Sequence, residues 1–260
     1  MDLGLEGRSV LVTGGSGGIG LATARAFAAE GCALHLAART PENLQAAQED
    51  ISRDFGVPVT VHAVDLSRTG NALRLAETCA DVDVLVNNAG AVPGGGIGEI
   101  DDDRWREGWD LKVFGYVNMM RALYAEMKAR GRGVIVNVIG TAGDQRPADY
   151  AAGISANAAL STLTRALGGE SLDHGVRVVG VSPGDMTNRR GTEFLRRQAE
   201  KEFGDPGRWR ERLARLPGGR AATSESVADA ILFLASPRAG YVSGTVLTID
   251  GGLSSRRSVT

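Results

Sequence analysis

A cluster of glycines at residues 14–20 is the feature of this chain whose residue types and spacing most directly suggest chemistry. It follows the apolar segment VLVT at residues 10–13 and precedes the segment LATARAFAAEG, which has the apolar face of a helix. Glycines allow a tight turn at the end of a strand, and the first N–H groups of the next helix then point at a bound anion with the positive end of the helix dipole behind them. The arrangement predicts a binding site for the pyrophosphate of a dinucleotide.

Two glycine spacings fit such a loop. The string G-x-G-x-x-G is met by Gly15, Gly17 and Gly20, and the string G-x-x-x-G-x-G is met by Gly14, Gly18 and Gly20. Glycine-rich turns are common, so the weight of the prediction comes from the strand before the loop and the helix after it.

The residues that end the second expected strand bear on which dinucleotide fits. An Asp or Glu at this place binds the two ribose hydroxyls of NAD and repels a 2′-phosphate. Here the strand ends in Ala38, and Arg39 follows. A guanidinium can pair with a phosphate through charge-assisted hydrogen bonds, so the sequence favours NADP. The alternative is that Arg39 stacks on the adenine with either cofactor, which leaves NAD open.

The wider pattern shows which elements must position these residues. Apolar segments typical of strands lie at residues 10–13, 33–39, 59–65, 82–90, 133–140, 176–184 and 245–250, and helical patterns lie between them at residues 21–31, 41–55, 72–79, 103–130, 151–173 and 224–235. Apolar strands separated by helices predict a single α/β domain over residues 1–260, with a parallel sheet of about seven strands covered by helices on both faces. Ligands in such sheets bind beyond the carboxyl ends of the strands.

Composition excludes several classes of protein. The net charge of −2 argues against a nucleic-acid binder, and no apolar run is long enough to span a membrane. No secretory signal is seen, so we expect a cytoplasmic protein. Cys32 and Cys79 are too few for a disulfide framework and lack metal-ligand spacing. Since His35 and His62 fall in expected strands, we predict structural roles for both and no metal site.

Four segments, in this order, resemble the short-chain dehydrogenase/reductase family over nearly the whole chain: TGGSGGIG at 13–20, NNAG at 87–90, SPG at 182–184, and residues 244–252, which begin GT and end DGG. The resemblance implies a Rossmann-type, doubly wound sheet and a nicotinamide dinucleotide. It also implies hydride transfer between a secondary alcohol and a ketone of a small-molecule substrate, by a homodimer or homotetramer.

The resemblance also assigns cofactor contacts by position. Asp65 would bind the adenine amino group with Leu66 beside the ring, and Pro183 and Gly184 would lie at the nicotinamide carboxamide. The remaining expected contacts are with the pyrophosphate and ribose, at Gly14, Ser16, Gly17, Gly18, Ile19, Gly20, Asn87, Ala89, Gly90 and Thr187.

The catalytic positions depart from the family pattern. The family carries Asn in the fourth crossover helix, Ser after the fifth strand, and Tyr followed four residues later by Lys. These positions are here Lys112, Gly140, Gly153 and Asn157. All four are substituted, and Lys and Asn have exchanged places between two helices that face one cavity in this fold.

Nearby residues offer replacements for the missing groups. Tyr150, three residues before Gly153, could place its phenol in the space that a glycine leaves open. Lys112 could lower the pKa of that phenol if its ammonium came within about 4–6 Å. Thr141 could orient a carbonyl, and Asn157 could hold the ribose or a proton relay. The alternative for each is a purely structural role.

Two further features are less specific. Ser155 is a second, weaker candidate for the missing hydroxyl. Residues 186–220, which should form a substrate lid, hold ten basic and five acidic residues. Such a cationic rim could recruit an anionic substrate such as an acyl thioester, although a solvated helix face with internal ion pairs explains it equally well.

The sequence therefore predicts an NADP(H)-preferring oxidoreductase with rearranged catalytic residues. The main alternative is a catalytically impaired dinucleotide-binding subunit or redox sensor, because loss of a general acid removes about 10²–10⁴ in rate. A third interpretation keeps the cofactor but changes the reaction, for example to enoyl reduction.

Overall fold

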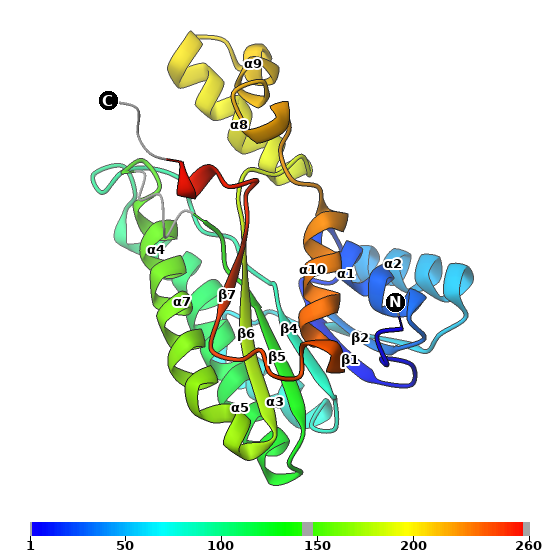
Figure 1. Cartoon of the computed structure of the whole chain (residues 1–260). Coiled ribbons are helices and arrows are strands. Elements are labelled where there is room, and N and C mark those ends of the chain that lie inside the picture. Colours follow the sequence, from blue (N-terminus) through cyan, green and yellow to red (C-terminus); the bar gives the residue numbers. More distant parts are fainter. Residues whose placement is uncertain (1, 142–147, 257–260) are drawn as a thin grey trace.

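The computed structural model describes residues 2–141 and 148–256, which form one parallel sheet flanked by helices (Figure 1). The sheet has seven strands in the order β3-β2-β1-β4-β5-β6-β7. The strands are β1 (Ser9–Thr13), β2 (Ala33–Ala38), β3 (Val59–Ala63), β4 (Val84–Asn87), β5 (Gly133–Val138), β6 (Val176–Pro183) and β7 (Val246–Ile249). The doubly wound parallel sheet predicted from the sequence is confirmed.

Helices cover both faces of this sheet. Those packed on one face are α1 (Gly18–Ala29), α2 (Pro41–Phe55) and α10 (Ser224–Ala235), and those on the other are α3 (Thr69–Thr78), α5 (Gly115–Ala129) and α7 (Ala151–Ser171). Each face has its own buried apolar cluster, because every central strand is apolar on both sides. No helix in the described part of the chain combines the length and apolar character needed to cross a membrane.

The long helix expected at residues 103–130 is interrupted. It consists of α4 (Asp102–Trp109), the π-helical turn η1 (Asp110–Phe114) and α5. The Gly115 N–H bonds the carbonyl of Asp110, five residues earlier. Such wide turns are rare in proteins overall, and those that occur are often found at functional sites. Hydrophobic periodicity does not reveal one, so the sequence predicted a continuous helix.

The segment at residues 186–220, called the lid segment below after the sequence-based expectation, follows β6. It contains α8 (Arg189–Phe203) and α9 (Trp209–Leu213), which stand apart from the sheet at the end where β6 finishes (Figure 1). Most expected strands end earlier than predicted. β2, β3, β4 and β5 stop at residues 38, 63, 87 and 138, because the polar and glycine residues that follow belong to the loops at the carboxyl edge.

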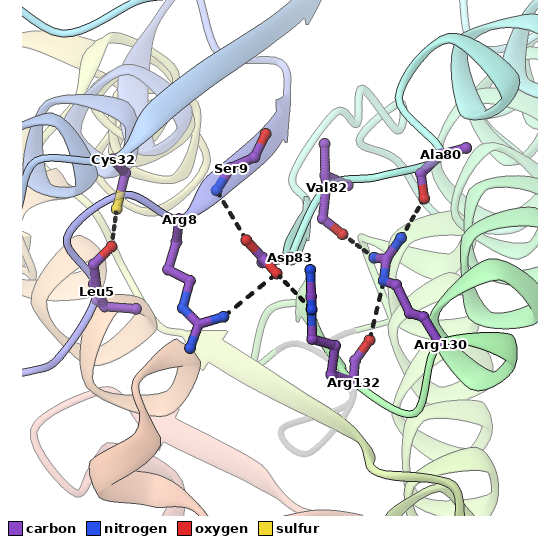
Figure 2. A network of polar contacts seen from close by, with 9 residues as sticks. All are labelled: Leu5, Arg8, Ser9, Cys32, Ala80, Val82, Asp83, Arg130 and Arg132. Atoms are coloured by element: carbon purple, nitrogen blue, oxygen red, sulfur yellow. Dashed lines mark hydrogen bonds and ion pairs between the residues drawn. The ribbon is translucent and has the colours of Figure 1, made fainter.

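The amino ends of the central strands are joined by one carboxylate, that of Asp83 (Figure 2). It accepts hydrogen bonds from the Ser9 backbone N–H at 3.2 Å, from Arg132 at 3.3 Å and from Arg8 at 3.5 Å. Arg130 donates to two backbone carbonyls just before β4. β1, β4 and β5 therefore begin at a common, polar anchor.

We expect Asp83→Ala to lower the free energy of unfolding by about 1–3 kcal/mol, because three donors lose a largely buried acceptor. Urea denaturation measures this loss. The matched control is Asp50→Ala, which removes an exposed carboxylate paired with Arg53 on α2 and should change stability by less than about 0.5 kcal/mol. Equal effects of the two substitutions would contradict the anchoring role.

Candidate active site

The glycine loop after β1 discriminates between the two spacings. Gly14 and Gly18 have φ of +67° and +54°, which side chains other than glycine rarely adopt. A Cβ on Gly20 would lie 2.1 Å from the carbonyl oxygen of Gly14, so no side chain fits there. Gly17, by contrast, is extended and faces open space. The spacing that the fold requires is therefore G-x-x-x-G-x-G.

The start of α1 fits a bound phosphate. Its N-cap, Gly17, has no side chain to accept from the first N–H groups, and the first turn contains no acidic residue. The first backbone N–H groups of α1 are therefore available to bind an anion. Ser16 lies beside them in the loop, partly exposed, and Ile19 packs inward on the core.

Two loop ends meet beside this turn, where the strand order reverses between β1 and β4. The Thr13 hydroxyl donates to the Val86 carbonyl and accepts from the N–H groups of Asn88 and Ala89 at 2.9 and 3.0 Å. The Asn88 amide donates in return to the Thr13 carbonyl at 3.0 Å. Ligands of doubly wound sheets bind at such a reversal. The sequence assigned no role to Asn88, although a second Asn in NNAG was the available signal.

Asn87 lies differently from the expectation. Its side chain is fully buried and donates to Asn137 at 3.0 Å, between β4 and β5. The Asn87 side chain therefore points into the sheet and away from the loop, which begins at Asn88 and continues with Ala89 and Gly90. The reason is strand alternation, since successive side chains point to opposite faces.

The adenine end of the expected cofactor path lies at β2 and β3. Arg39 is exposed directly after β2. Asp65 follows β3, and its carboxylate accepts from the Ser67 N–H at 3.0 Å. The Leu66 side chain is 4% exposed and packs in the core with α3 and α5, which leaves little of it to lie along an adenine ring.

At the opposite end, the chain after β6 is closely packed. A Cβ on Gly184 would lie 2.7 Å from the side chain that follows β7, so Gly184 allows a close backbone approach beside Pro183. The Thr187 hydroxyl donates to the Ala222 carbonyl at 3.3 Å. Asp185, for which the sequence offers no explanation, lines a cavity of about 160 Å³ between the lid segment and β7. Burial raises the pKa of its carboxyl.

Tyr150 stands at the N-cap of α7, and its ring occupies the space above Gly153. A Cβ on Gly153 would lie 2.0 Å from Cζ of this ring. Gly95 forms a β-bridge with Tyr150, in which the Gly95 carbonyl accepts from the Ala151 N–H at 3.1 Å. The sequence predicted that the phenol would lean into the space left by Gly153, and the coordinates show this contact. The bracing by Gly95 was missed.

Lys112 projects from the π-helical turn toward the end of β5. Its amine donates to the carbonyls of Val138 at 3.3 Å and Ile139 at 2.8 Å, and its aliphatic chain lies against Gly90. Burial, and to a smaller extent the positive charge of Arg190, lower the pKa of the Lys112 amine to about 7. Near neutral pH this amine can therefore gain or lose a proton.

Asn157 meets the chain at the same place. A Cβ on Gly140, which has φ of +127°, would lie 2.9 Å from the Asn157 Nδ2. Asn157 Oδ1 is buried and has no hydrogen-bond partner among the described residues. Thr141, the next residue, is buried, and its N–H donates to the Pro183 carbonyl at 2.9 Å. The Thr141 hydroxyl faces Gly184.

Ser155 does not join this group. Its hydroxyl donates to the carbonyl of Ala151 at 2.8 Å, one turn back in α7. A serine inside a helix commonly makes this bond. The structural interpretation of Ser155 is therefore the better one.

One face of α8 approaches Tyr150. The rings of Phe194 and Tyr150 are 6.3 Å apart, and Arg190 donates to the Gly90 carbonyl. Arg197, about two turns after Arg190 in α8, lies near the glycines that follow β4. Burial raises the pKa of the Tyr150 phenol, while the charges of Arg190 and Arg197 lower it. The sequence did not single out these two among the ten basic residues.

Other lid charges pair within the lid. Arg212 and Arg215 both bind Glu202, and Arg208 pairs with Glu211 at 2.7 Å. The solvated-face interpretation therefore holds for this half of the lid, while Arg190 and Arg197 lie toward the site.

Comparison with known proteins identifies relatives along the full chain. The family model described as short chain dehydrogenase matches residues 8–199. Galactitol 2-dehydrogenase (L-tagatose-forming) of Cereibacter sphaeroides is 35% identical over 95% of each chain, and L-xylulose reductase of Mus musculus is 33% identical over 97% of this chain and 98% of its own.

A solved structure agrees in fold as well as in sequence. L-sorbose reductase from Gluconobacter frateurii, complexed with NADPH and L-sorbose, superposes with a TM-score of 0.90 at 31% identity, over 99% of this chain and 100% of the other. The seven-stranded sheet, the glycine loop at its reversal point and these matches agree. The chain belongs to the short-chain dehydrogenase family.

Proposed function

We propose that this dehydrogenase is an NADP(H)-preferring enzyme whose proton chemistry has moved to Tyr150 and Lys112. The proposal starts from the family reaction, in which an NAD(P)-dependent oxidoreductase interconverts an alcohol and a ketone. The observation that carries the proposal is that the Tyr150 ring occupies the space that a side chain on Gly153 would fill. When bound, the nicotinamide supplies or accepts the hydride.

Tyr150 is assigned as the proton donor to the carbonyl oxygen in reduction and as the acceptor in oxidation. A phenol needs a lowered pKa for this role, because proton transfer is most efficient when the pKa lies near the working pH. Burial raises the pKa of the Tyr150 phenol, and the positive charges of Arg190 and Arg197 offset part of that rise by favouring the phenolate. The positive charge near the Tyr150 phenol is thus assigned to two arginines of α8, whereas the sequence suggested the ammonium of Lys112.

Lys112 is assigned as the next group in the proton path. A neutral amine has two N–H donors and one lone pair, and the two donors are accounted for by the Val138 and Ile139 carbonyls. The remaining position holds a proton below pH 7 and a lone pair above it. Lys112 can thus receive a proton and return it without rearranging its backbone contacts.

Asn157 and Thr141 complete the proposed set. The buried Oδ1 of Asn157 is an acceptor without a partner in the described chain, which suits a ribose hydroxyl. The Thr141 hydroxyl, buried beside Gly184, would orient the substrate carbonyl.

The cofactor preference rests on Arg39. It follows β2 where an acidic residue would select NAD, and its guanidinium is exposed and close to the end of the strand. The NADPH complex of L-sorbose reductase supports the same cofactor. Asp65 would bind the adenine, and the N-terminus of α1 would bind the pyrophosphate.

The substrate is proposed to be a ketone or secondary alcohol with polar substituents. The relatives named above act on polyols or on sugars with a keto group. Arg190 and Arg197 also suit a carboxylate or an acyl thioester carrying negative charge. A substrate panel should therefore contain both keto sugars and anionic ketones.

The proposal predicts that Tyr150→Phe lowers kcat by about 10²–10⁴ while NADPH binding is retained, because only the proton donor is removed. Gly153→Ala should cause a comparable loss, since the new methyl group displaces the phenol. NADPH oxidation over the panel and cofactor titration by fluorescence measure the two quantities.

Gly169→Ala is the matched control, because this glycine of the same helix faces open space. It should leave kcat unchanged. Undiminished turnover in Tyr150→Phe would remove this residue from the mechanism. Tight NADPH binding without turnover of any substrate by the wild type would instead favour the impaired subunit.

Lys112 predicts a pH dependence of stability. The pKa of its amine is about 7 in the folded chain and about 10.5 when unfolded, so between these values the unfolded chain binds more protons. Relative to Lys112→Met, the free energy of unfolding of the wild type should rise from pH 7 to 9, by at most about 1.4 kcal/mol per pH unit. Urea denaturation at several pH values tests this. A difference that does not change with pH would contradict the lowered pKa.

Arg39→Ala is expected to weaken NADPH about 10- to 100-fold and NADH by much less, because a charge-assisted bond to the 2′-phosphate is worth about 1.5–3 kcal/mol. Dissociation constants for both cofactors provide the measurement. Arg53→Ala on α2, whose guanidinium pairs with Asp50 and Asp54, is the control and should change neither. Equal weakening of NADPH and NADH would defeat the NADP assignment.

A further inference from the structure

Three metal-ligating side chains meet beside the edge of the sheet, away from the proposed proton path. His35 comes from β2, His62 from β3, and Cys79 from the end of α3. His35 Nδ1 lies 3.0 Å from His62 Nε2, and Cys79 Sγ lies 3.7 Å from the same nitrogen. The three ligand atoms all lie within 4.8 Å of one another.

One hydrogen bond cannot account for both contacts that His62 Nε2 makes in this cluster. His62 Nε2 carries either one proton or one lone pair, yet both His35 Nδ1 and Cys79 Sγ approach it. If Nε2 is an acceptor, two donors compete for one lone pair. If it is a donor, one proton is shared between two acceptors. A single cation among the three atoms would instead bind a lone pair of each.

We propose that His35, His62 and Cys79 form a site for a divalent zinc-like cation. Tetrahedral zinc has bonds of about 2.0–2.1 Å to nitrogen and 2.3 Å to sulfur, which places neighbouring ligand atoms roughly 3.3–3.6 Å apart. The two separations from His62 Nε2, 3.0 and 3.7 Å, lie near these values, and the third pair, His35 Nδ1 and Cys79 Sγ, lies within 4.8 Å and would close as the ion binds. Imidazole and thiolate ligands together suit zinc rather than calcium or magnesium.

The surroundings provide access and compensating charge. A cavity of about 410 Å³ is lined by His62, Asp65, Asn71 and neighbouring residues, so the cluster is open to solvent on the His62 side. Asp81 raises the pKa of both His35 and Cys79, which places its negative charge within range of the ion. One thiolate and this carboxylate together balance a double positive charge.

Burial favours the uncharged form of all three side chains while no ion is bound. It lowers the pKa of both imidazoles. Burial raises the pKa of the Cys79 thiol to about 12. Zinc would displace the proton of that thiol, as in other sites with cysteine ligands.

The site departs from the sequence-based expectation of no metal centre. The ligands are 27 and 17 residues apart, and neither interval is a metal-binding motif. The parallel register pairs Ala37 with His62, which brings His35 and His62 onto one face of the sheet. The site ties β2 and β3 to α3 a few residues before Arg39 and Asp65, so loading should stiffen the adenine end of the cofactor path.

Cobalt(II) added to the untagged, EDTA-treated protein tests the site directly. We expect one cobalt per chain and a thiolate-to-cobalt charge-transfer band in the near ultraviolet, lost on addition of zinc. Zinc should also raise the thermal unfolding midpoint. Absence of the band in the wild type would overturn the proposal, whatever the outcome of the kinetic tests above.

Cys32→Ser is the matched control, because Cys32 is buried and donates only to the Leu5 carbonyl, a bond that serine can keep (Figure 2). The chain has two cysteines, so a band that survives Cys32→Ser comes from Cys79. His62→Gln should weaken cobalt binding by more than about 100-fold, beyond the loss of an outer-shell partner. A band that disappears in Cys32→Ser, or unchanged binding in His62→Gln, would refute the assignment.

Discussion

The structure depends on one close approach at the point where the strand order reverses. The Thr13 hydroxyl and the Asn88 amide hold the ends of β1 and β4 together, and Gly20 lets α1 begin directly against the Gly14 carbonyl. Any side chain at Gly20 would push the helix away from the strand. This close approach therefore sets the direction of the α1 N-terminus and with it the proposed pyrophosphate site.

Around the proposed proton path, glycines make room for larger polar side chains. In three places a polar side chain lies in the space that a side chain on a glycine would fill. The pairs are Gly153 with the Tyr150 ring, Gly140 with the Asn157 amide, and Gly90 with the Lys112 stem. Since tightly packed interiors leave few empty volumes, each glycine and its polar neighbour constrain one another. A side chain added at any of these glycines would shift the polar group beside it.

Electrostatics in this region come from two different parts of the chain. The π-helical turn carries Lys112 under the end of β5, where burial lowers its pKa, and α8 brings Arg190 and Arg197 over Tyr150. With a pKa of about 7, the Lys112 amine carries its charge only part of the time at neutral pH, whereas a guanidinium keeps its charge. The charge and the movable proton are therefore carried by separate residues.

The sequence by itself determined the order of strands and helices, the glycine loop and the vacancy at Gly153, because these depend on local periodicity and on residues close along the chain. It could not choose between two glycine spacings, place Asn87 inside the sheet, or detect the π-helical turn. Only the tertiary structure decided those, along with the lid arginines that face Tyr150 and the meeting of His35, His62 and Cys79. The physical reason is that strand register and helix packing join residues far apart in sequence, and no local pattern encodes which of their side chains will touch.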